Sequence, residues 1–283
     1  MKILVFGATG QVATELQLQG GDALTALGRD RTDLTDPALC AEIIRQTDAE
    51  AVINAAAYTA VDRAEQEEAL ATLVNGTAPV AMARAAAERG LPFLHLSTDY
   101  VFAGQGSAPH RPGDPPAPLN AYGRSKLAGE AGIRAAGGPH AILRTSWIFS
   151  AHGANFVKAM LRLSQSRDRL DVVADQIGGP TPAADLAAAL LTMAQALREG
   201  QPGGTYHLAG AEPTSWAGFA RETFARAGRA VAVRDIPSAD FPTPAKRPLN
   251  SRLDCATLET DFGIAQPDWR DGLERVLRDL ERA

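Results

Sequence analysis

The pattern that most constrains this chain is an alternation of short apolar runs with longer helical segments through its first half. The apolar runs have strand length and cover residues 3–6, 23–27, 51–54, 93–97 and 141–144. The helical segments begin near residue 11 and at Asp36-Pro37, an N-cap followed by a proline, and cover 66–89 and 118–136. Strands that alternate with helices at this spacing predict βαβ units, and therefore an α/β fold with a doubly wound parallel sheet.

The second half lacks this clean alternation, which indicates a smaller second part. We expect helices over residues 155–166, 185–198 and 269–282 and a short strand over 205–208. Residues 236–250 contain four of the 18 prolines, so an extended, irregular segment is expected there. We predict a larger domain over residues 1–150. Residues 151–283 would form mainly a C-terminal lobe that is interleaved with it and does not fold independently.

The charge balance excludes several classes of partner. The chain has 28 lysines and arginines against 33 aspartates and glutamates, a formal net charge of −5. It therefore lacks the clustered positive charge that nucleic-acid scaffolds and polybasic membrane binders need. Hydrophobic residues make up 45% of the sequence, which rules out intrinsic disorder. A negatively charged substrate would have to be held by local positive groups.

Cysteine and histidine usage argues against a disulfide framework and a metal site. Cys40 and Cys255 are far apart, and the five histidines occur singly, without the spacing that holds zinc. The apolar run before Gly7 is too short for a signal peptide, and no uncharged apolar stretch is long enough to span a bilayer. We therefore expect a protein of the reducing cytoplasm with no metal.

A glycine-rich turn directly follows the first expected strand and opens a helix. In the segment 7–13, GATGQVA, Gly7 would permit a tight turn and Gly10 would let the backbone approach a pyrophosphate. Ala13 takes the third small position, and the helix N-terminus favours the anion. This spacing is similar to that of short-chain dehydrogenase/reductases and predicts a dinucleotide site. The alternative is a tight turn without a ligand.

The end of the second expected strand bears on cofactor choice. An acidic residue there binds the 2′-hydroxyl of NAD, whereas an arginine accommodates the 2′-phosphate of NADP. Here Gly28 and Arg29 favour NADPH, and Asp30 leaves use of NADH open. The alternative is a solvated, charged turn.

Tyr122 and Lys126 carry the clearest chemical signal. At positions i and i+4 of the helix expected over 118–136, they share one helix face. A free tyrosine has a pKa of about 10, too high for efficient proton transfer at neutral pH, and a neighbouring ammonium would lower that pKa. Thr98, at a strand end, supplies a hydroxyl for the same substrate oxygen. Together the three residues predict a proton-transfer site, although the tyrosine–lysine spacing alone occurs by chance on many helices.

Other candidates for chemistry are weaker. His95 and His207 fall in strand-like segments, where hydrogen-bonded core histidines are expected. Trp216 and Trp269 are most simply packing residues of the C-terminal lobe. The chain has neither a P-loop nor a nucleophile elbow.

Six stretches of the sequence resemble the dTDP-4-dehydrorhamnose reductases, which are extended short-chain dehydrogenase/reductases. Together they extend over nearly the whole chain, and the last lies outside the cofactor-binding half. They are residues 7–12, 54–62, 97–102, 118–126, 144–147 and 247–253. The resemblance implies a Rossmann-type domain that uses NADPH to reduce the 4-keto group of dTDP-4-dehydro-β-L-rhamnose, giving dTDP-β-L-rhamnose.

The resemblance also implies which residues bind the cofactor. Tyr122 would be the proton donor, and Lys126, its partner, would also touch the ribose. The phosphates would be contacted by Gly10, Gln11 and Val12. The adenine would be contacted by Asp33 and Leu34. The ribose and nicotinamide side would be contacted by Ala56, Ala57 and Tyr58.

For the substrate, the resemblance implies that Thr98 and Asp99 bind the sugar and that Trp147 touches it. By analogy with nucleotide-sugar enzymes, Arg247 would pair with the pyrophosphate. The alternative for Arg247 is a surface arginine without a ligand.

Some members of the family bind Mg²⁺ between subunits, and a homodimer is compatible with the resemblance. Glu15 matches one such carboxylate ligand, but Ala184 stands where a second would be sought. A surface glutamate is therefore the better interpretation of Glu15.

Two other functions compete with the reductase. A nucleotide-sugar epimerase or dehydratase would share the fold, but a dehydratase needs an acidic pair after the threonine, and here Asp99 is followed by Tyr100. A non-catalytic, cofactor-binding regulatory subunit also shares this fold. The presence of Thr98, Tyr122 and Lys126 disfavours it, and turnover decides the question.

Overall fold

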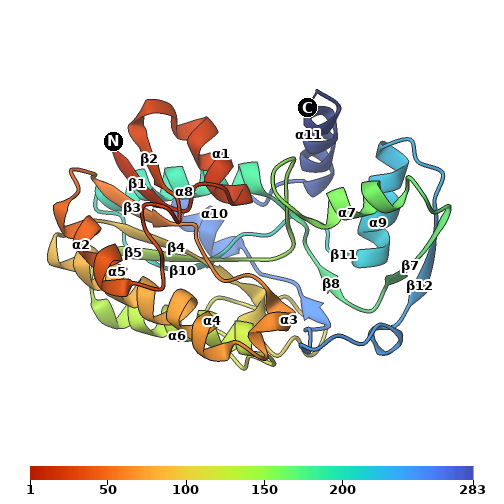
Figure 1. Cartoon of the computed structure of the whole chain (residues 1–283), viewed down its shortest axis with the longest axis horizontal. Coiled ribbons are helices and arrows are strands. Elements are labelled where there is room, and N and C mark those ends of the chain that lie inside the picture. Colours follow the sequence, from red (N-terminus) through yellow and green to blue (C-terminus); the bar gives the residue numbers. More distant parts are fainter. Residues whose placement is uncertain (283) are drawn as a thin grey trace.

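The computed structural model describes residues 1–282, and its centre is a six-stranded parallel sheet (Figure 1). The strand order is β10-β5-β4-β3-β1-β2. The strands are β1 (Ile3–Phe6), β2 (Leu24–Leu27), β3 (Ala51–Asn54), β4 (Phe93–Thr98), β5 (His140–Thr145) and β10 (Gly204–His207). After β2 the chain returns to the other side of β1, so the order reverses between β1 and β3. Ligands of such sheets bind at that reversal, beyond the carboxyl ends of the strands. The predicted Rossmann-type α/β fold is confirmed.

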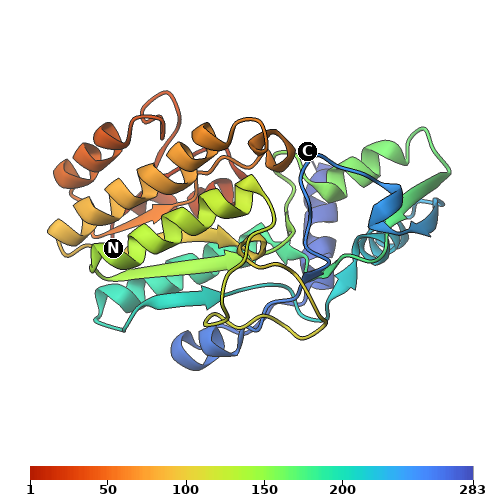
Figure 2. The same cartoon turned by 90° about the horizontal axis from the view of Figure 1, so that it is seen from below.

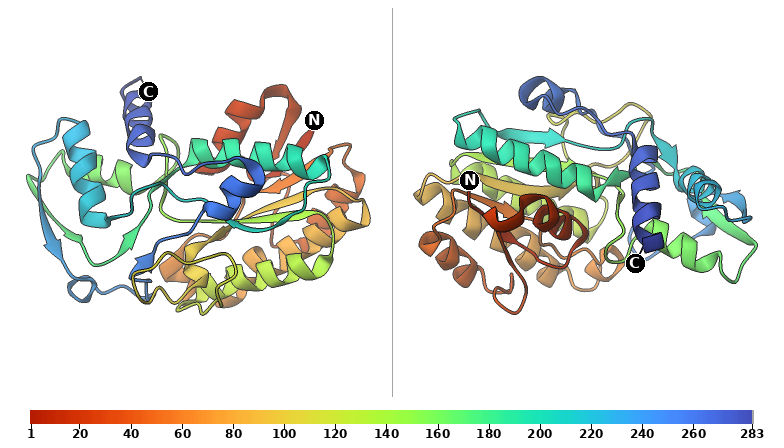
Figure 3. Two further views of the ribbon diagram at one scale, coloured as in Figure 1. Left: turned by 180° about the vertical axis from the view of Figure 1, so that it is seen from behind. Right: turned by 90° about the horizontal axis from the view of Figure 1, so that it is seen from above.

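Helices cover both faces of the sheet. Successive residues of β1 point to opposite faces, so they pack under different helices. Ile3 and Val5 pack under α1 (Gln11–Gly20) and α8 (Ala183–Arg198), whereas Leu4 and Phe6 pack under three other helices. These are α2 (Pro37–Gln46), α5 (Ala78–Glu88) and α6 (Ala121–Ala136). Figure 2 shows α5 and α6 side by side along one face, and the right panel of Figure 3 shows α1 and α8 on the other. We call the sheet with these helices the sheet domain.

The helix expected over residues 66–89 is interrupted in the structure. It consists of α4 (Glu68–Thr72), a π-helical turn (Leu73–Thr77) and α5, with α3 (Val61–Ala64) just before it. The π-turn lies against α6, where a Cβ on Gly129 would come within 2.2 Å of the Asn75 carbonyl oxygen. π-turns often mark functional sites. This one sets how closely α6 approaches its neighbour.

The second lobe is built on α7 (Phe156–Leu163), α9 (Trp216–Arg226) and α11 (Trp269–Arg282). Beside them β7 (Arg169–Val173) pairs with β12 (Ala232–Ile236) in parallel. Phe149, Phe219 and Trp269 form its aromatic core, so Trp269 packs as expected. In Figure 1, α11 stands between the sheet domain and α9.

Short elements join the two parts. The remaining ones are β6 (Ile148–Phe149), β8 (Ile177–Gly178), β9 (Thr181–Pro182), β11 (Thr214–Ser215), β13 (Asn250–Ser251) and α10 (Ala256–Phe262), with 3₁₀ turns at Gly21–Ala23, Asp99–Val101 and Ser238–Asp240. Residues after 150 also supply α8 and β10 to the sheet domain, so the chain passes between the two parts more than once. Within residues 1–282, no helix is long and apolar enough to cross a membrane.

Candidate active site

The helix that carries Tyr122 and Lys126 begins at a well-defined cap. The side chain of Asn120 accepts a hydrogen bond from the Gly123 amide at 2.8 Å and donates one to the Lys246 carbonyl, also at 2.8 Å. A Cβ on Gly123 would lie 2.2 Å from the Tyr100 carbonyl oxygen. Only glycine therefore lets α6 approach the 3₁₀ turn after β4 so closely. The cap therefore places Tyr122 in the first turn of α6, beside β4.

The Lys126 ammonium is hydrogen-bonded to the backbone of β4. Its Nζ donates to the Leu96 carbonyl oxygen at 2.6 Å and lies 3.3 Å from His95 Nε2. The amide of Asn54 accepts from the Ala56 N–H at 3.1 Å, and its Nδ2 lies 3.1 Å from His95 Nδ1. Burial lowers the pKa of Lys126 to about 8. The pKa of His95 lies well below its usual value, because of burial first and the Lys126 charge second.

Both histidines expected in the core are buried and hydrogen-bonded. His207 has its Nδ1 3.1 Å from the His110 carbonyl oxygen, and burial lowers its pKa to about 3. His95 is bonded to Asn54 as described. With a lowered pKa, each ring stays uncharged at neutral pH.

The pKa of Tyr122 moves in the opposite direction from the sequence-based expectation. It is raised to about 12, chiefly by burial and to a smaller extent by the Asp99 charge, and a hydrogen bond with Thr98 partly opposes the rise. Lys126 does not lower it, because its ammonium is turned to the Leu96 carbonyl. The predicted lowering of the Tyr122 pKa by Lys126 is therefore wrong for this structure. Tyr122 keeps its proton at neutral pH, as a proton donor must.

The carboxyl end of β4 brings Thr98 and Asp99 next to Tyr122. The Thr98 hydroxyl accepts from the Tyr100 N–H at 3.2 Å and donates to Asp99 Oδ1 at 3.1 Å. Asp99 is 3% exposed, and burial raises its pKa to about 6. Its Oδ2 has no partner in hydrogen-bond geometry among residues 1–282, although the Ser251 hydroxyl is near enough to lower the Asp99 pKa. A buried acceptor without a partner is costly, so a donor from a ligand is the natural complement.

Two buried polar residues behind the site were missed by the sequence reasoning. Glu130, one turn beyond Lys126 on α6, accepts from Ser97 at 2.6 Å and from two nitrogens of Arg144 at 2.8 and 2.6 Å. It thereby ties α6 to β4 and β5. Its i+4 spacing from Lys126, which places both residues on one face of α6, is the signal in the sequence that could have identified it.

The other is Asn75, in the π-turn. Its Oδ1 accepts from the Tyr58 amide at 2.8 Å, and its Nδ2 donates to the Tyr58 carbonyl and to the Ser125 hydroxyl, both at 3.0 Å. Asn75 therefore holds the loop after β3 against α6. No local pattern in the sequence marked this residue.

The glycine turn has the geometry that a dinucleotide needs. Gly7 has φ +108°, and a Cβ there would lie 3.3 Å from the Ala55 and Ala56 backbone. Gly10 is the N-cap of α1, and a Cβ there would meet no atom of the described residues within 4 Å. The turn therefore packs against the loop after β3 at Gly7 and is open at Gly10, where a phosphate could approach.

The residues that follow the turn can face a phosphate only with their backbone. Val12 is 4% exposed and faces the core from α1. The Gln11 side chain reaches the chain after β6, where its Oε1 accepts from Ser150 at 2.9 Å and from Asn155 at 3.0 Å. Gln11 thus links the glycine turn to the start of the second lobe.

The other proposed cofactor residues lie in the loops after β2 and β3. Asn75 fixes the backbone of Tyr58, whose hydroxyl donates to Glu67 at 2.6 Å, and Ala56 and Ala57 precede it. After β2, Leu34 is buried among core residues. Hydrogen bonds from Thr35 lower the pKa of Asp33. Its side chain is therefore turned back on its own loop.

The end of β2 leaves Arg29 exposed. A Cβ on the neighbouring Gly28 would lie 2.5 Å from Asp30 Oδ1, so the Asp30 carboxylate folds back over Gly28. A positive and a negative group therefore both flank the position expected for the cofactor ribose.

Trp147 and Arg247 lie on the side of the second lobe. Trp147 has φ +50° and stacks on Trp216 with ring centroids 3.7 Å apart. Trp216 therefore supports a proposed substrate residue in addition to packing. The Arg247 guanidinium donates to both carboxylate oxygens of Asp62, at 3.0 and 2.8 Å. Arg247 is half-buried and paired, which differs from a freely solvated surface arginine.

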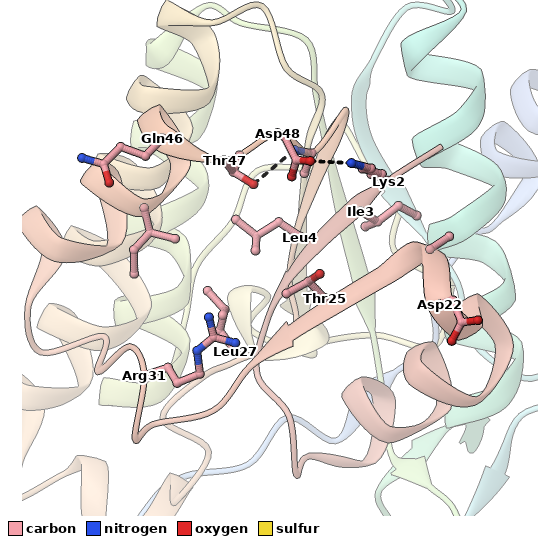
Figure 4. Close-up of a pocket in the computed structure, with 13 residues that line it drawn as sticks. Lys2, Ile3, Leu4, Asp22, Thr25, Leu27, Arg31, Gln46, Thr47 and Asp48 are labelled. Carbon is pink, nitrogen blue, oxygen red and sulfur yellow. Dashed lines mark hydrogen bonds and ion pairs between the residues drawn. The ribbon is translucent and has the colours of Figure 1, made fainter.

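Two other features lie apart from this site. A cavity of about 420 Å³ lies between β1, β2 and α2, lined by Lys2, Thr25 and Arg31 among others (Figure 4). It contains none of the predicted site residues. Glu15 lies 3.3 Å from His152 Nε2, and no group of three or more metal-binding side chains occurs within residues 1–282.

Comparison with known proteins places the chain in a family. The family model described as RmlD substrate binding domain matches residues 1–282. A dTDP-4-dehydrorhamnose reductase from Sinorhizobium fredii is 43% identical, over 98% of this chain and 97% of the relative.

Two crystal structures are similar over the whole chain. A dTDP-4-dehydrorhamnose reductase from Clostridium acetobutylicum has a TM-score of 0.93 at 35% identity, covering 99% of this chain and 100% of its own. One from Bacillus anthracis, in complex with NADP, has a TM-score of 0.92 at 34% identity and the same coverage. The chain therefore belongs to the RmlD substrate binding domain family, together with these dTDP-4-dehydrorhamnose reductases.

Proposed function

We propose that this chain reduces the 4-keto group of dTDP-4-dehydro-β-L-rhamnose with NADPH, giving dTDP-β-L-rhamnose. The observation that carries the proposal is the end of β4, where Asp99 presents a buried oxygen without a partner beside Thr98 and the protonated Tyr122. Relatives with this activity in their names match the whole chain at about 40% identity, which supports the same substrate.

The glycine turn and the residues near it fit a dinucleotide. The space at Gly10 and the N-terminus of α1 would receive the pyrophosphate, with the backbone N–H groups of Gln11 and Val12 as donors. Arg29 would meet the 2′-phosphate of NADPH. When bound, NADPH supplies the hydride that reduces C4 of the sugar.

The chain itself supplies the proton and the orientation of the sugar. Tyr122 would donate its phenolic proton to the C4 oxygen as negative charge develops there, and Thr98 would hydrogen-bond the same oxygen. Asp99 Oδ2 would accept from a sugar hydroxyl. Lys126 would turn from the Leu96 carbonyl toward the cofactor ribose and Tyr122, where its charge would ease loss of the proton.

The second lobe would hold the rest of the substrate. Trp147, braced by Trp216, would lie against the sugar, and Arg247 would pair with the pyrophosphate. Arginine binds phosphate oxygens in pairs, which suits a diphosphate.

The direct test incubates purified protein with dTDP-4-dehydro-β-L-rhamnose and NADPH and identifies the product. We expect NADPH consumption equal to the dTDP-β-L-rhamnose formed. Interconversion of nucleotide sugars without net NADPH oxidation would indicate an epimerase. NADPH binding without turnover would indicate a regulatory subunit. Either result overturns the proposal.

A homodimer and a cytoplasmic location are also proposals. Light scattering on the purified chain, with and without Mg²⁺, tests the dimer, and fractionation of cells tests the location.

A further inference from the structure

Arg247 is held to the sheet domain by a carboxylate that has no assigned role. Asp62 lies in α3, which follows the loop containing Ala56 and Tyr58, and Figure 1 shows α3 on the side of the sheet domain nearest the second lobe. Its Oδ1 accepts from Arg247 Nη1 at 3.0 Å and from the Ala245 amide at 3.1 Å, and its Oδ2 accepts from Arg247 Nη2 at 2.8 Å. One carboxylate therefore orders both the backbone and the side chain of this segment.

The segment has few other means of taking a defined position. It belongs to a proline-rich stretch without regular structure between a 3₁₀ turn at Ser238–Asp240 and β13. Its other anchors are Asn120, the cap of α6, which donates to the Lys246 carbonyl, and the Ile177 amide, which donates to the Leu249 carbonyl. The elements that carry Arg247 are therefore fixed by Asp62 and by the cap of the helix that carries Tyr122.

The contacts of Arg247 leave one edge of its guanidinium for a ligand. Asp62 takes one hydrogen from each terminal nitrogen, and the Ala245 carbonyl, at 3.3 Å, takes the second hydrogen of Nη1. Neither Asp62 nor Ala245 uses Nε–H or the second Nη2–H, and these two form the parallel pair that binds phosphate oxygens in bidentate fashion. The Tyr100 hydroxyl is a further hydrogen-bond neighbour of the guanidinium.

Tyr100 connects Arg247 to Tyr122, the proposed proton donor. Burial alone would lower the pKa of Arg247, but the hydrogen bond to Asp62 and contact with Tyr100 raise it. The Tyr100 ring in turn meets Tyr122 edge-on, with centroids 5.6 Å apart. The Asp62 carboxylate thus offsets the cost of holding a half-buried cation near the substrate.

We propose that Asp62 is a positioning residue for diphosphate binding, which holds Arg247 so that its Nε–Nη2 edge faces the substrate pyrophosphate. The inference rests on the proposed function for the identity of the ligand. The opposite possibility is that Asp62 competes with the phosphate for the guanidinium, and the two make opposite predictions.

The test measures binding of dTDP, thymidine and NADPH by calorimetry, independently of turnover. We expect Asp62→Asn, which keeps an acceptor for the Ala245 amide, to weaken dTDP binding by roughly tenfold, because a charge-assisted pair is lost. Binding of thymidine and NADPH should change less than twofold. In an Arg247→Ala background the Asp62→Asn change should have no further effect on dTDP, as expected for coupled residues.

Controls separate this role from damage to the fold. Asp171→Asn breaks a similar pair, with Arg234 in the second lobe, and should leave dTDP affinity unchanged. Asp62→Glu, which retains the charge, should restore part of the affinity. Unchanged or tighter dTDP binding in Asp62→Asn, or equal weakening of NADPH, would overturn the inference. If the wild-type chain binds dTDP in this pattern but does not reduce the sugar, only the proposed function fails.

Discussion

Tyr122 is the residue on which the proposed chemistry most directly depends. Replacing it with phenylalanine keeps the partly buried ring in place but removes the hydroxyl that carries the proton. We expect kcat to fall by roughly 10²–10⁴-fold, the usual contribution of a positioned general acid, while NADPH affinity stays near wild type. Single-turnover kinetics with a titration of NADPH measures both. Near-native turnover in Tyr122→Phe would refute the assignment.

Asp99 should make stability depend on pH in a defined window. Burial raises its pKa to about 6 in the folded chain, against the ordinary value of 3.8 when unfolded. Between these values the folded state binds more protons, so the Asp99 contribution is full below pH 4 and is lost as the pH rises through about 6. The loss amounts to about 3 kcal/mol at neutral pH.

Asp99→Asn removes this titration. We therefore expect the variant to gain stability relative to wild type by up to about 3 kcal/mol between pH 4 and pH 8, while its sugar binding weakens. Urea unfolding at several pH values measures the difference. A constant difference between the two proteins would show that Asp99 ionises normally.

Arg29 should set the cofactor preference. Because Arg29 is exposed beside the folded-back Asp30, we expect a preference for NADPH of about tenfold in kcat/KM, with NADH still used. Arg29→Ala should remove most of that preference by weakening NADPH alone, and Arg31→Ala serves as the matched control. Equal efficiency with both cofactors in the unmodified chain, or a variant that loses both alike, would contradict this role.

At the scale of elements, α6 packs closely against the π-turn near the site. A Cβ on Gly129 would come within 2.2 Å of the Asn75 carbonyl oxygen, which is backbone and cannot rotate away. We expect Gly129→Ala to destabilise the fold by about 1–3 kcal/mol, the usual cost of overpacking, and to weaken NADPH binding because Asn75 holds the loop at Tyr58.

Thermal unfolding and an NADPH titration check both effects. Gly113→Ala, where a Cβ would meet no atom of the described residues within 4 Å, is the control and should change neither. If Gly129→Ala were as stable as wild type, the π-turn would be free to move, and its part in placing the cofactor loop would be disproved.

At the scale of the whole molecule, the site is assembled from both parts of the chain. The sheet domain contributes the glycine turn, the end of β4 and the start of α6, while Trp147 and Arg247 come from segments that lead into the second lobe. Gln11 and Asp62 connect the two parts close to the proposed ligands. Substrate binding and lobe position are therefore linked through few, identifiable contacts.

The sequence by itself determined the sheet domain, because its signals are local. Buried parallel strands such as β1 and β3 are continuous apolar runs, and the cap at Asp36-Pro37 lies where α2 begins. The i, i+4 spacing of Tyr122 and Lys126 also lies within one helix. In the second lobe, α9 and the pairing of β7 with β12 were missed, because exposed residues interrupt the apolar pattern of β7 and its partner is distant in sequence.

Only the tertiary structure decided the state of the site residues. Arg247 meets Asp62 across 185 positions, and Trp147 stacks on a tryptophan from another helix. The pKa of Tyr122 rises because neighbouring elements bury its side chain. The Lys126 ammonium does not lower that pKa, because it donates to the Leu96 carbonyl of β4 instead. Residue spacing predicts which side chains share a face. Burial and competing partners, which set charge and hydrogen bonding, depend on segments that meet only when the chain has folded.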